Sequence, residues 1–144
     1  MGLTIKIEAQ VNHAGEMAQQ LETVLGQVVR VCAFNLEGLA KSFSRVDTGA
    51  MRAGWYTATY EANNYPVAAA QAVSKAKRPI TALPAIQPNN PLEAIVANCV
   101  EYAIYNEMGT VRMSAQPMSA PAAAIVGPEF QKAIAAAIKK AAGG

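Results

Sequence analysis

Hydrophobic and polar positions alternate over the first residues of the chain. In LTIKIE (3–8), apolar side chains hold the odd positions and polar side chains the even ones. This period of two predicts a short strand with one buried face. From about residue 13 to residue 44 the apolar spacing changes to three or four. The repeating positions are Met17, Leu21, Leu25, Val28, Cys32, Leu36, Leu39 and Phe43.

Such a stripe predicts one amphipathic helix over 13–44. About 30 residues at 1.5 Å each would make a rod of roughly 45 Å. Gly26 and Gly38 lie inside this segment, and each weakens a helix by about 1 kcal/mol relative to alanine. We therefore expect a bend at one of them.

Two further strands are predicted on either side of a proline-rich segment. Residues 55–62 (WYTATYEA) and 92–99 (LEAIVANC) carry strand-forming residues. The intervening 63–91 holds five of the eight prolines, which excludes a long helix or a central strand. We interpret it as an extended loop or arm, in which AAAQAVSKAK has the composition for about two helical turns.

The last third of the chain is predicted to be mainly helical. Residues 102–108 (YAIYNEM) form a short helix or turn, and Gly109 stands where a left-handed residue would end it. A connector covers 111–121. The C-terminal helix is expected to break at Gly127-Pro128, with Pro128 starting a new helix. The apolar stripe of that helix is Phe130, Ile134 and Ile138, with Lys139 and Lys140 near its negative end.

Composition suggests a subunit that neighbours cover. The 144 residues suit a single domain. Hydrophobic residues reach 52%, many of them alanine, and charged residues only 15%, against about 25% in ordinary domains. A net charge of +2 and a pI of about 8.6 give no strong nucleic-acid signature. No apolar run approaches the roughly 20 residues of a membrane span, and the N-terminus lacks a signal-peptide layout.

The candidate chemical groups do not assemble into a catalytic or metal site. His13 is the single histidine, and a zinc site needs about three or four ligands. Cys32 and Cys99 are far apart, so we expect buried thiols in a reducing, cytoplasmic setting rather than a disulfide. Glu101 and Glu107 could pair as catalytic carboxylates, although solvation of a short helix is the favoured interpretation.

Other polar groups also leave two interpretations open. Tyr102 and Tyr105 share a helix face, where packing is favoured over base stacking. The cluster of Lys75, Lys77 and Arg78 could meet DNA phosphates or a neighbouring subunit, although such loop clusters are more often solvated. The chain has no Walker loop and no GxGxxG motif. We expect no enzyme activity and no cofactor.

Three segments, taken in order, resemble one protein family. VDTGAMRAGW (46–55) is similar to a D-T-G-x-[LM]-R segment, YAIYNEMGTVRM (102–113) to a Y-A-x-Y-x-E-[FM]-G-T signature, and SAQPMSAPAAA (114–124) to an A-[RQ]-P-[FM]-x-x-P-A continuation. Together they resemble the neck or tail-completion family of tailed bacteriophages, also described as minor tail components. The resemblance covers roughly 1–62 and 92–140. The motif residues are Asp47, Thr48, Gly49, Arg52, Tyr102, Tyr105, Glu107, Gly109, Thr110, Pro117 and Pro121.

The resemblance implies both a fold and a function. The implied fold is a single α+β domain over 1–144, with a small antiparallel sheet flanked by a long N-terminal helix and a C-terminal helix, similar to tail-terminator and tail-tube folds. The implied function is a structural virion protein that forms a ring at the head–tail junction, around the DNA channel. Implied partners are copies of the chain, as a hexamer or less favourably a dodecamer, portal-side head-completion or adaptor proteins, and tail-terminator or tail-tube proteins.

Two departures and two alternatives accompany this interpretation. The usual arginine and phenylalanine of the third motif are Gln116 and Met118 here. A tail-terminator ring is the nearest alternative, and a DNA-binding module is a more distant one. We expect Tyr102, Ile104, Tyr105 and Met108 to anchor a corner at which Gly109 turns the chain. Asp47, as a helix N-cap, together with Thr48 and Gly49, would close a second corner.

Overall fold

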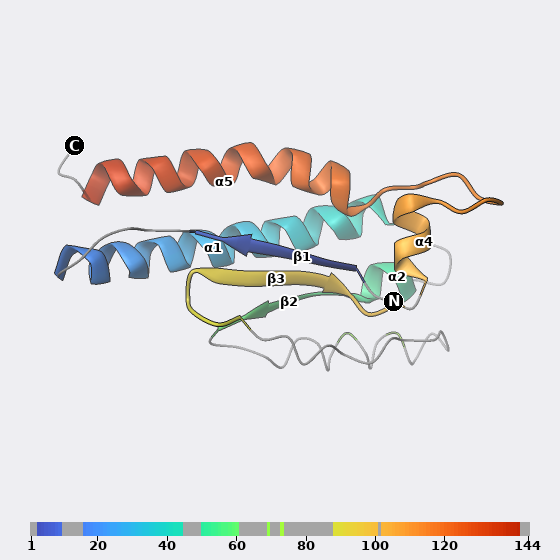
Figure 1. Ribbon diagram of the computed structural model, residues 1–144, viewed down its shortest axis with the longest axis horizontal. Coiled ribbons are helices and arrows are strands. Elements are labelled where there is room, and N and C mark those ends of the chain that lie inside the picture. The colour runs from blue at the N-terminus through green and yellow to red at the C-terminus, as the bar shows by residue number, and fades with distance from the viewer. Residues whose placement is uncertain are drawn as a thin grey trace.

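The structure is a computed structural model (Figure 1). It describes residues 3–9, 16–44, 50–60, 69, 73, 88–100 and 102–141, with only the backbone for 16–19. The elements are β1 (Leu3–Glu8), α1 (Glu16–Phe43), α2 (Ala50–Ala53), β2 (Trp55–Thr59), β3 (Glu93–Asn98), α4 (Ala103–Met108) and α5 (Ser119–Ala141). A three-stranded antiparallel sheet packs against the long N-terminal and C-terminal helices, which confirms the α+β prediction at this level.

The sheet has the order β1-β3-β2, so β3 is central. Val96 is paired with Ile5 on one side and with Thr57 on the other. Strand 3–8 is confirmed with its predicted bounds. The other two strands are shorter than predicted, at 55–59 instead of 55–62 and 93–98 instead of 92–99. All residues of β2 and β3 are buried, so both faces of these two strands are shielded from water.

One face of the sheet is covered by α1. The Thr57 hydroxyl donates a hydrogen bond of 3.2 Å to Glu37 of that helix, which places α1 on the face that carries Ile5 and Val96. On β1, alternation holds as predicted: Ile7 is buried, whereas Lys6 and Glu8 on the opposite face are exposed. The edge strand β1 thus keeps one solvent-exposed face, whereas the central strand β3 and the other edge strand β2 are buried on both faces.

A polar clamp ties β1 to the start of β3. Lys6 Nζ lies 2.7 Å from the carboxylate of Glu93, and the Asn89 amide donates to the same carboxylate at 2.7 Å. The hydrogen bond from Lys6 is the largest cause that lowers the Glu93 pKa, followed by the Asn89 amide. The turn before β3 also approaches α1 closely, because a Cβ at Gly26 would lie 3.2 Å from the Pro91 carbonyl oxygen.

Helix α1 is a single helical element that runs past both Gly26 and Gly38. Its buried side is rotated slightly from the predicted stripe. Val28 and Leu39 lie at its edge and Phe43 is exposed, whereas small residues complete the contact with the core. The buried positions described in this helix are Leu21, Leu25, Gly26, Val29, Cys32, Ala33, Leu36 and Ala40. The pattern predicted the helix correctly but favoured large residues over the alanines.

Helix α5 runs antiparallel beside α1 (Figure 1). The predicted break at Gly127-Pro128 is wrong, because α5 is one helix with Pro128 inside it. A proline at this position removes the hydrogen bond to the carbonyl of residue 124. Ala124 and Pro128 are both exposed, so water can bond the freed carbonyl. Packing of the opposite side, with Ala122 and Val126 buried, holds the helix together.

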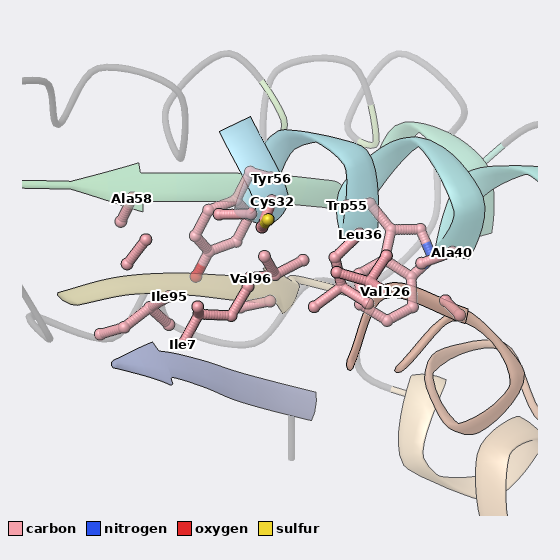
Figure 2. Packing of buried hydrophobic residues seen from close by; sticks show 14 of the residues in the cluster. Ile7, Cys32, Leu36, Ala40, Trp55, Tyr56, Ala58, Ile95, Val96 and Val126 are labelled. Carbon is pink, nitrogen blue, oxygen red and sulfur yellow. The ribbon is translucent and has the colours of Figure 1, made fainter. Parts of the chain in front are cut away.

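The centre of the core is where α1, β2 and α5 meet. Figure 2 shows Trp55 beside Leu36, Ala40 and Val126. The Trp55 indole donates to the Ser44 hydroxyl at 2.8 Å, and Ser44 bonds back to the Ala40 carbonyl. The buried indole nitrogen therefore has its partner. Cys32 and Cys99 are free and buried, as predicted. No helix among the described residues is long and apolar enough to cross a membrane.

Candidate functional site

The site with the most specific geometry is the joint between α4 and α5. Glu107, in the last turn of α4, is 7% exposed. One carboxylate oxygen accepts hydrogen bonds from the backbone N–H groups of Met118 at 2.9 Å and Ser119 at 2.8 Å. The other oxygen accepts from Ala120 at 3.1 Å. Glu107 is thus an N-terminal cap for α5 that is supplied by a different helix.

This cap accounts for every free donor at the start of α5. An α-helix begins with four N–H groups that have no partner inside the helix, and in α5 these belong to residues 118–121. Glu107 bonds the first three, and the fourth residue is Pro121, which has no N–H. Glu107 and Pro121 come from two separate sequence motifs. Their spacing is explained by the single helix terminus that they complete.

Opposing effects act on the Glu107 carboxyl. Its burial raises the pKa, but the N–H groups of Ser119, Met118 and Ala120 together outweigh burial, so the pKa is lower than usual. A carboxylate at the positive end of a helix dipole is also favoured in its charged form. Glu107 therefore stays ionised although it is buried, and its oxygens are engaged by the backbone. The interpretation of Glu107 as a solvated surface residue is wrong.

Gly109 makes the turn that brings Glu107 to α5. Its φ is +78°, a conformation that residues with a Cβ rarely adopt. A Cβ there would also lie 2.8 Å from the Ala115 nitrogen and 3.0 Å from the Met113 carbonyl oxygen. The Gly109 amide donates to the Tyr105 carbonyl at 2.8 Å. The predicted positive φ at Gly109 is confirmed, but its ψ of 172° differs from that of the left-handed helical cap that the sequence predicted.

The predicted anchors of this joint are only partly correct. Tyr102 packs against the core, but Tyr105 and Met108 are 52% and 72% exposed. Ala103 and Glu107 are the buried residues of α4. They lie four apart and share a helix face, so the large side chains of this six-residue helix point outward. Ile104 is half-buried.

The third motif joins the same site. Gln116 is half-buried, and its backbone N–H donates a hydrogen bond of 2.7 Å to the backbone carbonyl of Asn106. Met118, where the family pattern has phenylalanine, is 1% exposed and fills the core. Pro117 and Thr110 are exposed, and the Thr110 hydroxyl accepts from the Arg112 amide. Met118 thus packs in the core without an aromatic ring.

The first motif lies at a second corner, where α2 meets β2. Asp47, Thr48 and Gly49 fall outside the described residues, so the predicted cap is not seen. Arg52 is exposed, and its Nε donates to the Lys41 carbonyl at 3.1 Å, at the C-terminal end of α1. A cation there complements the helix dipole.

Asn98, which the sequence did not single out, holds this second corner. It is 2% exposed. Its amide donates to the Met51 carbonyl at 2.8 Å, and its side-chain oxygen accepts from the Val100 amide at 2.9 Å. Gly54 packs directly on it, because an added Cβ would lie 2.6 Å from the Asn98 oxygen. A lone asparagine at the end of an apolar strand was the available signal.

Five other candidate groups fall on parts of the chain that the structure does not describe. His13, Glu101, Lys75, Lys77 and Arg78 lie outside the described residues, as does most of 63–91. Within that segment the structure describes Ala69, Val73 and residues 88–91, and both Ala69 and Val73 are buried. Among the described residues no three potential metal ligands form a cluster. Burial raises the pKa of both cysteine thiols, which disfavours the reactive thiolate.

Comparison of the chain with protein-family models, with curated proteins and with solved structures finds no match.

Proposed function

We propose that the protein is a structural component of a tailed-bacteriophage virion. It forms a ring at the head–tail junction, around the DNA channel, and joins the head to the tail. We also propose that its fold is similar to that of tail-terminator and tail-tube proteins. The observation that carries it is the ordered set of three motifs, two of which converge on the start of α5.

The joint supports this proposal because it gives the resemblance a physical basis. Glu107 and Gly109 belong to the second motif, and Pro121 to the third. Glu107 caps α5, and Gly109 turns the chain. Pro121 has no N–H group, so it leaves no further free donor at the start of α5. The matching residues therefore build one structural element. Because backbone groups engage the Glu107 carboxylate, this element fits a structural role better than catalysis.

The proposed partners follow from the proposed place. Copies of the chain form the ring, with six favoured and twelve possible. On the head side it would contact head-completion, adaptor or portal proteins, and on the tail side a tail-terminator or tail-tube protein. Lys75, Lys77 and Arg78 could touch the DNA or a neighbouring subunit. Assembly takes place in the host cytoplasm, and the mature location is the virion.

Electron microscopy of a phage lysate tests the proposal. A stop codon is placed in this gene, and the wild-type protein is supplied from a plasmid as the control. Filled heads beside separate tails of normal length are expected, with joined particles restored by the plasmid. Tails of abnormal length would move the protein to the tail-terminator position. Normal infectious particles without the protein would refute both assignments.

A further inference from the structure

The outer edge of β1 carries backbone groups that point away from the sheet. In an antiparallel pair, successive residues direct their N–H and C=O groups alternately toward the partner strand and away from it. The Ala9 amide donates to the Leu92 carbonyl at 2.9 Å, and the register of β1 against β3 continues from this pair without a bulge. The odd residues of β1 therefore bond β3, and the backbone groups of Thr4 and Lys6 face outward.

These outward groups are open to a further strand. Among the residues that the structure describes, the outward N–H and C=O groups of Thr4 and Lys6 have no hydrogen-bond partner. The side chains of both residues are exposed. The other edge strand, β2, is different, because all five of its residues are buried. Within the described part of the chain, β1 is thus the accessible edge of the sheet.

The usual means of protecting an edge strand are missing or turned away at β1. Proteins protect such edges with a proline, a bulge or a charged side chain that projects past the edge. β1 contains no proline, and its pairing with β3 has no bulge. The Lys6 ammonium lies 2.7 Å from the carboxylate of Glu93 on β3. Its charge is therefore drawn toward the inner strand, and the outer edge keeps the shape that accepts a strand.

Helix α5 forms an apolar wall above this edge. It packs beside α1, which covers the sheet face that carries Ile5, so both helices belong to one layer. In Figure 1, α5 and β2 lie on opposite sides of β1. Phe130 and Ile134 of α5 pack against the core but are only half-buried, as is Ile5. Apolar side chains on this face of an added strand would cover the half-buried wall.

We propose that β1 accepts an extended segment of a partner protein as a fourth, antiparallel strand. The segment bonds the outward backbone groups of Thr4 and Lys6, and apolar residues at every second position face α5. Strand addition of this kind derives affinity from backbone hydrogen bonds and specificity from alternate side chains. This surface is independent of the proposed ring and of the proposed place in a virion.

A second copy does not fit this edge through its own β1. Two β1 strands in antiparallel pairing are related by a two-fold axis perpendicular to the sheet, which keeps the helices of both copies on the same face. Each α5 would then extend over the strands of the other copy, into the layer that α1 and α5 already fill. The occupant is therefore a segment that brings no helix layer of its own to that face.

Amide hydrogen exchange of the full chain, followed by NMR, tests the open edge and its occupant. In the free protein, the amides of Thr4 and Lys6 should exchange at least tenfold faster than those of Ile5 and Ile7, which bond β3. The probe is a peptide of five valine–threonine repeats with a lysine at each end. At saturating peptide, exchange at Thr4 and Lys6 should slow at least tenfold, with no change at Ile5 and Ile7.

Variants of the protein and of the peptide test the hydrogen bonds themselves. Thr4→Pro removes an outward N–H group and no bond to β3, so it should weaken peptide binding at least tenfold. Thr4→Val keeps the N–H group and is the matched control. In antiparallel pairing the peptide threonines face Thr4 and Lys6, so N-methylation of the threonines should abolish binding and N-methylation of the valines should not. Circular dichroism checks folding, and the methylated peptides need only the wild-type protein.

Several results would overturn the proposal. The first is equal exchange of the four amides in the free protein, and the second is a valine–threonine peptide that does not bind. Binding that survives Thr4→Pro or methylation of the threonines would place the peptide elsewhere. Protection of Thr4 and Lys6 that rises with protein concentration in the absence of peptide would make a second copy the occupant.

Discussion

The α4–α5 joint and the corner between α2 and β2 solve the same problem with different groups. At each, one buried polar side chain holds the backbone of a distant segment. Glu107 is ionised and accepts from three N–H groups at a helix start. Asn98 is neutral, donates to the Met51 carbonyl and accepts from the Val100 amide. A helix terminus, which offers donors alone, calls for a charged acceptor, whereas a corner with both a free carbonyl and a free amide calls for an amide side chain.

Loss of the Glu107 carboxylate should have the largest effect. Glu107→Ala leaves two buried N–H groups and one partly buried N–H group without a partner. Each such loss costs about 1–3 kcal/mol, so we expect the free energy of unfolding to fall by about 3–5 kcal/mol. Urea unfolding followed by circular dichroism measures the change. Glu107→Gln, which keeps one carbonyl oxygen, is the matched control and should lose less than half as much.

Removal of the Asn98 amide should rank second. Asn98→Ala frees one carbonyl and one N–H and leaves a small cavity, for an expected loss of about 2–3 kcal/mol. The same urea experiment applies. A loss at this corner as large as that of Glu107→Ala would contradict the idea that a charged acceptor with three donors contributes more than an amide.

The two glycines of these corners should respond differently to alanine. Gly109→Ala combines positive φ with contacts to backbone atoms, so we expect a loss of about 2 kcal/mol. Gly54→Ala meets the Asn98 side chain and Val100. Its cost should shrink by about 1 kcal/mol in an Asn98→Ala background, because the two residues touch. Double-mutant cycles measure this coupling. The cost of Gly109→Ala should not change in that background.

Acid should weaken the charged corner and spare the neutral one. The folded pKa of Glu107 is lowered, so its contribution is complete above the unfolded value of about 4.3. It is lost as the pH falls through the folded pKa. Urea midpoints between pH 7 and pH 3 should fall more steeply for wild type than for Glu107→Gln.

Glu93 requires its own control in that titration. The pKa of Glu93 is also lowered, first by the hydrogen bond from Lys6. Its contribution to the stability of the protein is therefore lost as the pH falls, as is that of Glu107. Glu93→Gln separates the two contributions. If the urea midpoint of Glu107→Gln falls as steeply with decreasing pH as that of wild type, the charge of the buried Glu107 carboxylate does not stabilise the protein as described.

Local patterns predicted most elements but not their packing. Strand 3–8 and the two long helices follow from periods of two and of three to four, which depend on neighbouring residues alone. The break at Pro128 was wrong because the cost of a proline was judged without the α1 surface that holds both halves of α5. The exposure of Tyr105 and Met108 was missed for a similar reason, since a short helix buries its small side rather than its largest residues.

The sequence by itself determined most of the segments and the turn at Gly109 with its positive φ. It placed Pro121 in a connector, whereas α5 begins at Ser119 and contains this proline. Tertiary structure alone decided what Glu107 and Asn98 do. Both are polar residues whose role depends on partners far along the chain: Met118–Ala120 for Glu107 and Met51 for Asn98. The residues adjacent in the sequence indicate only that a polar group is present. Only the folded backbone shows which unpaired donors and acceptors it must satisfy.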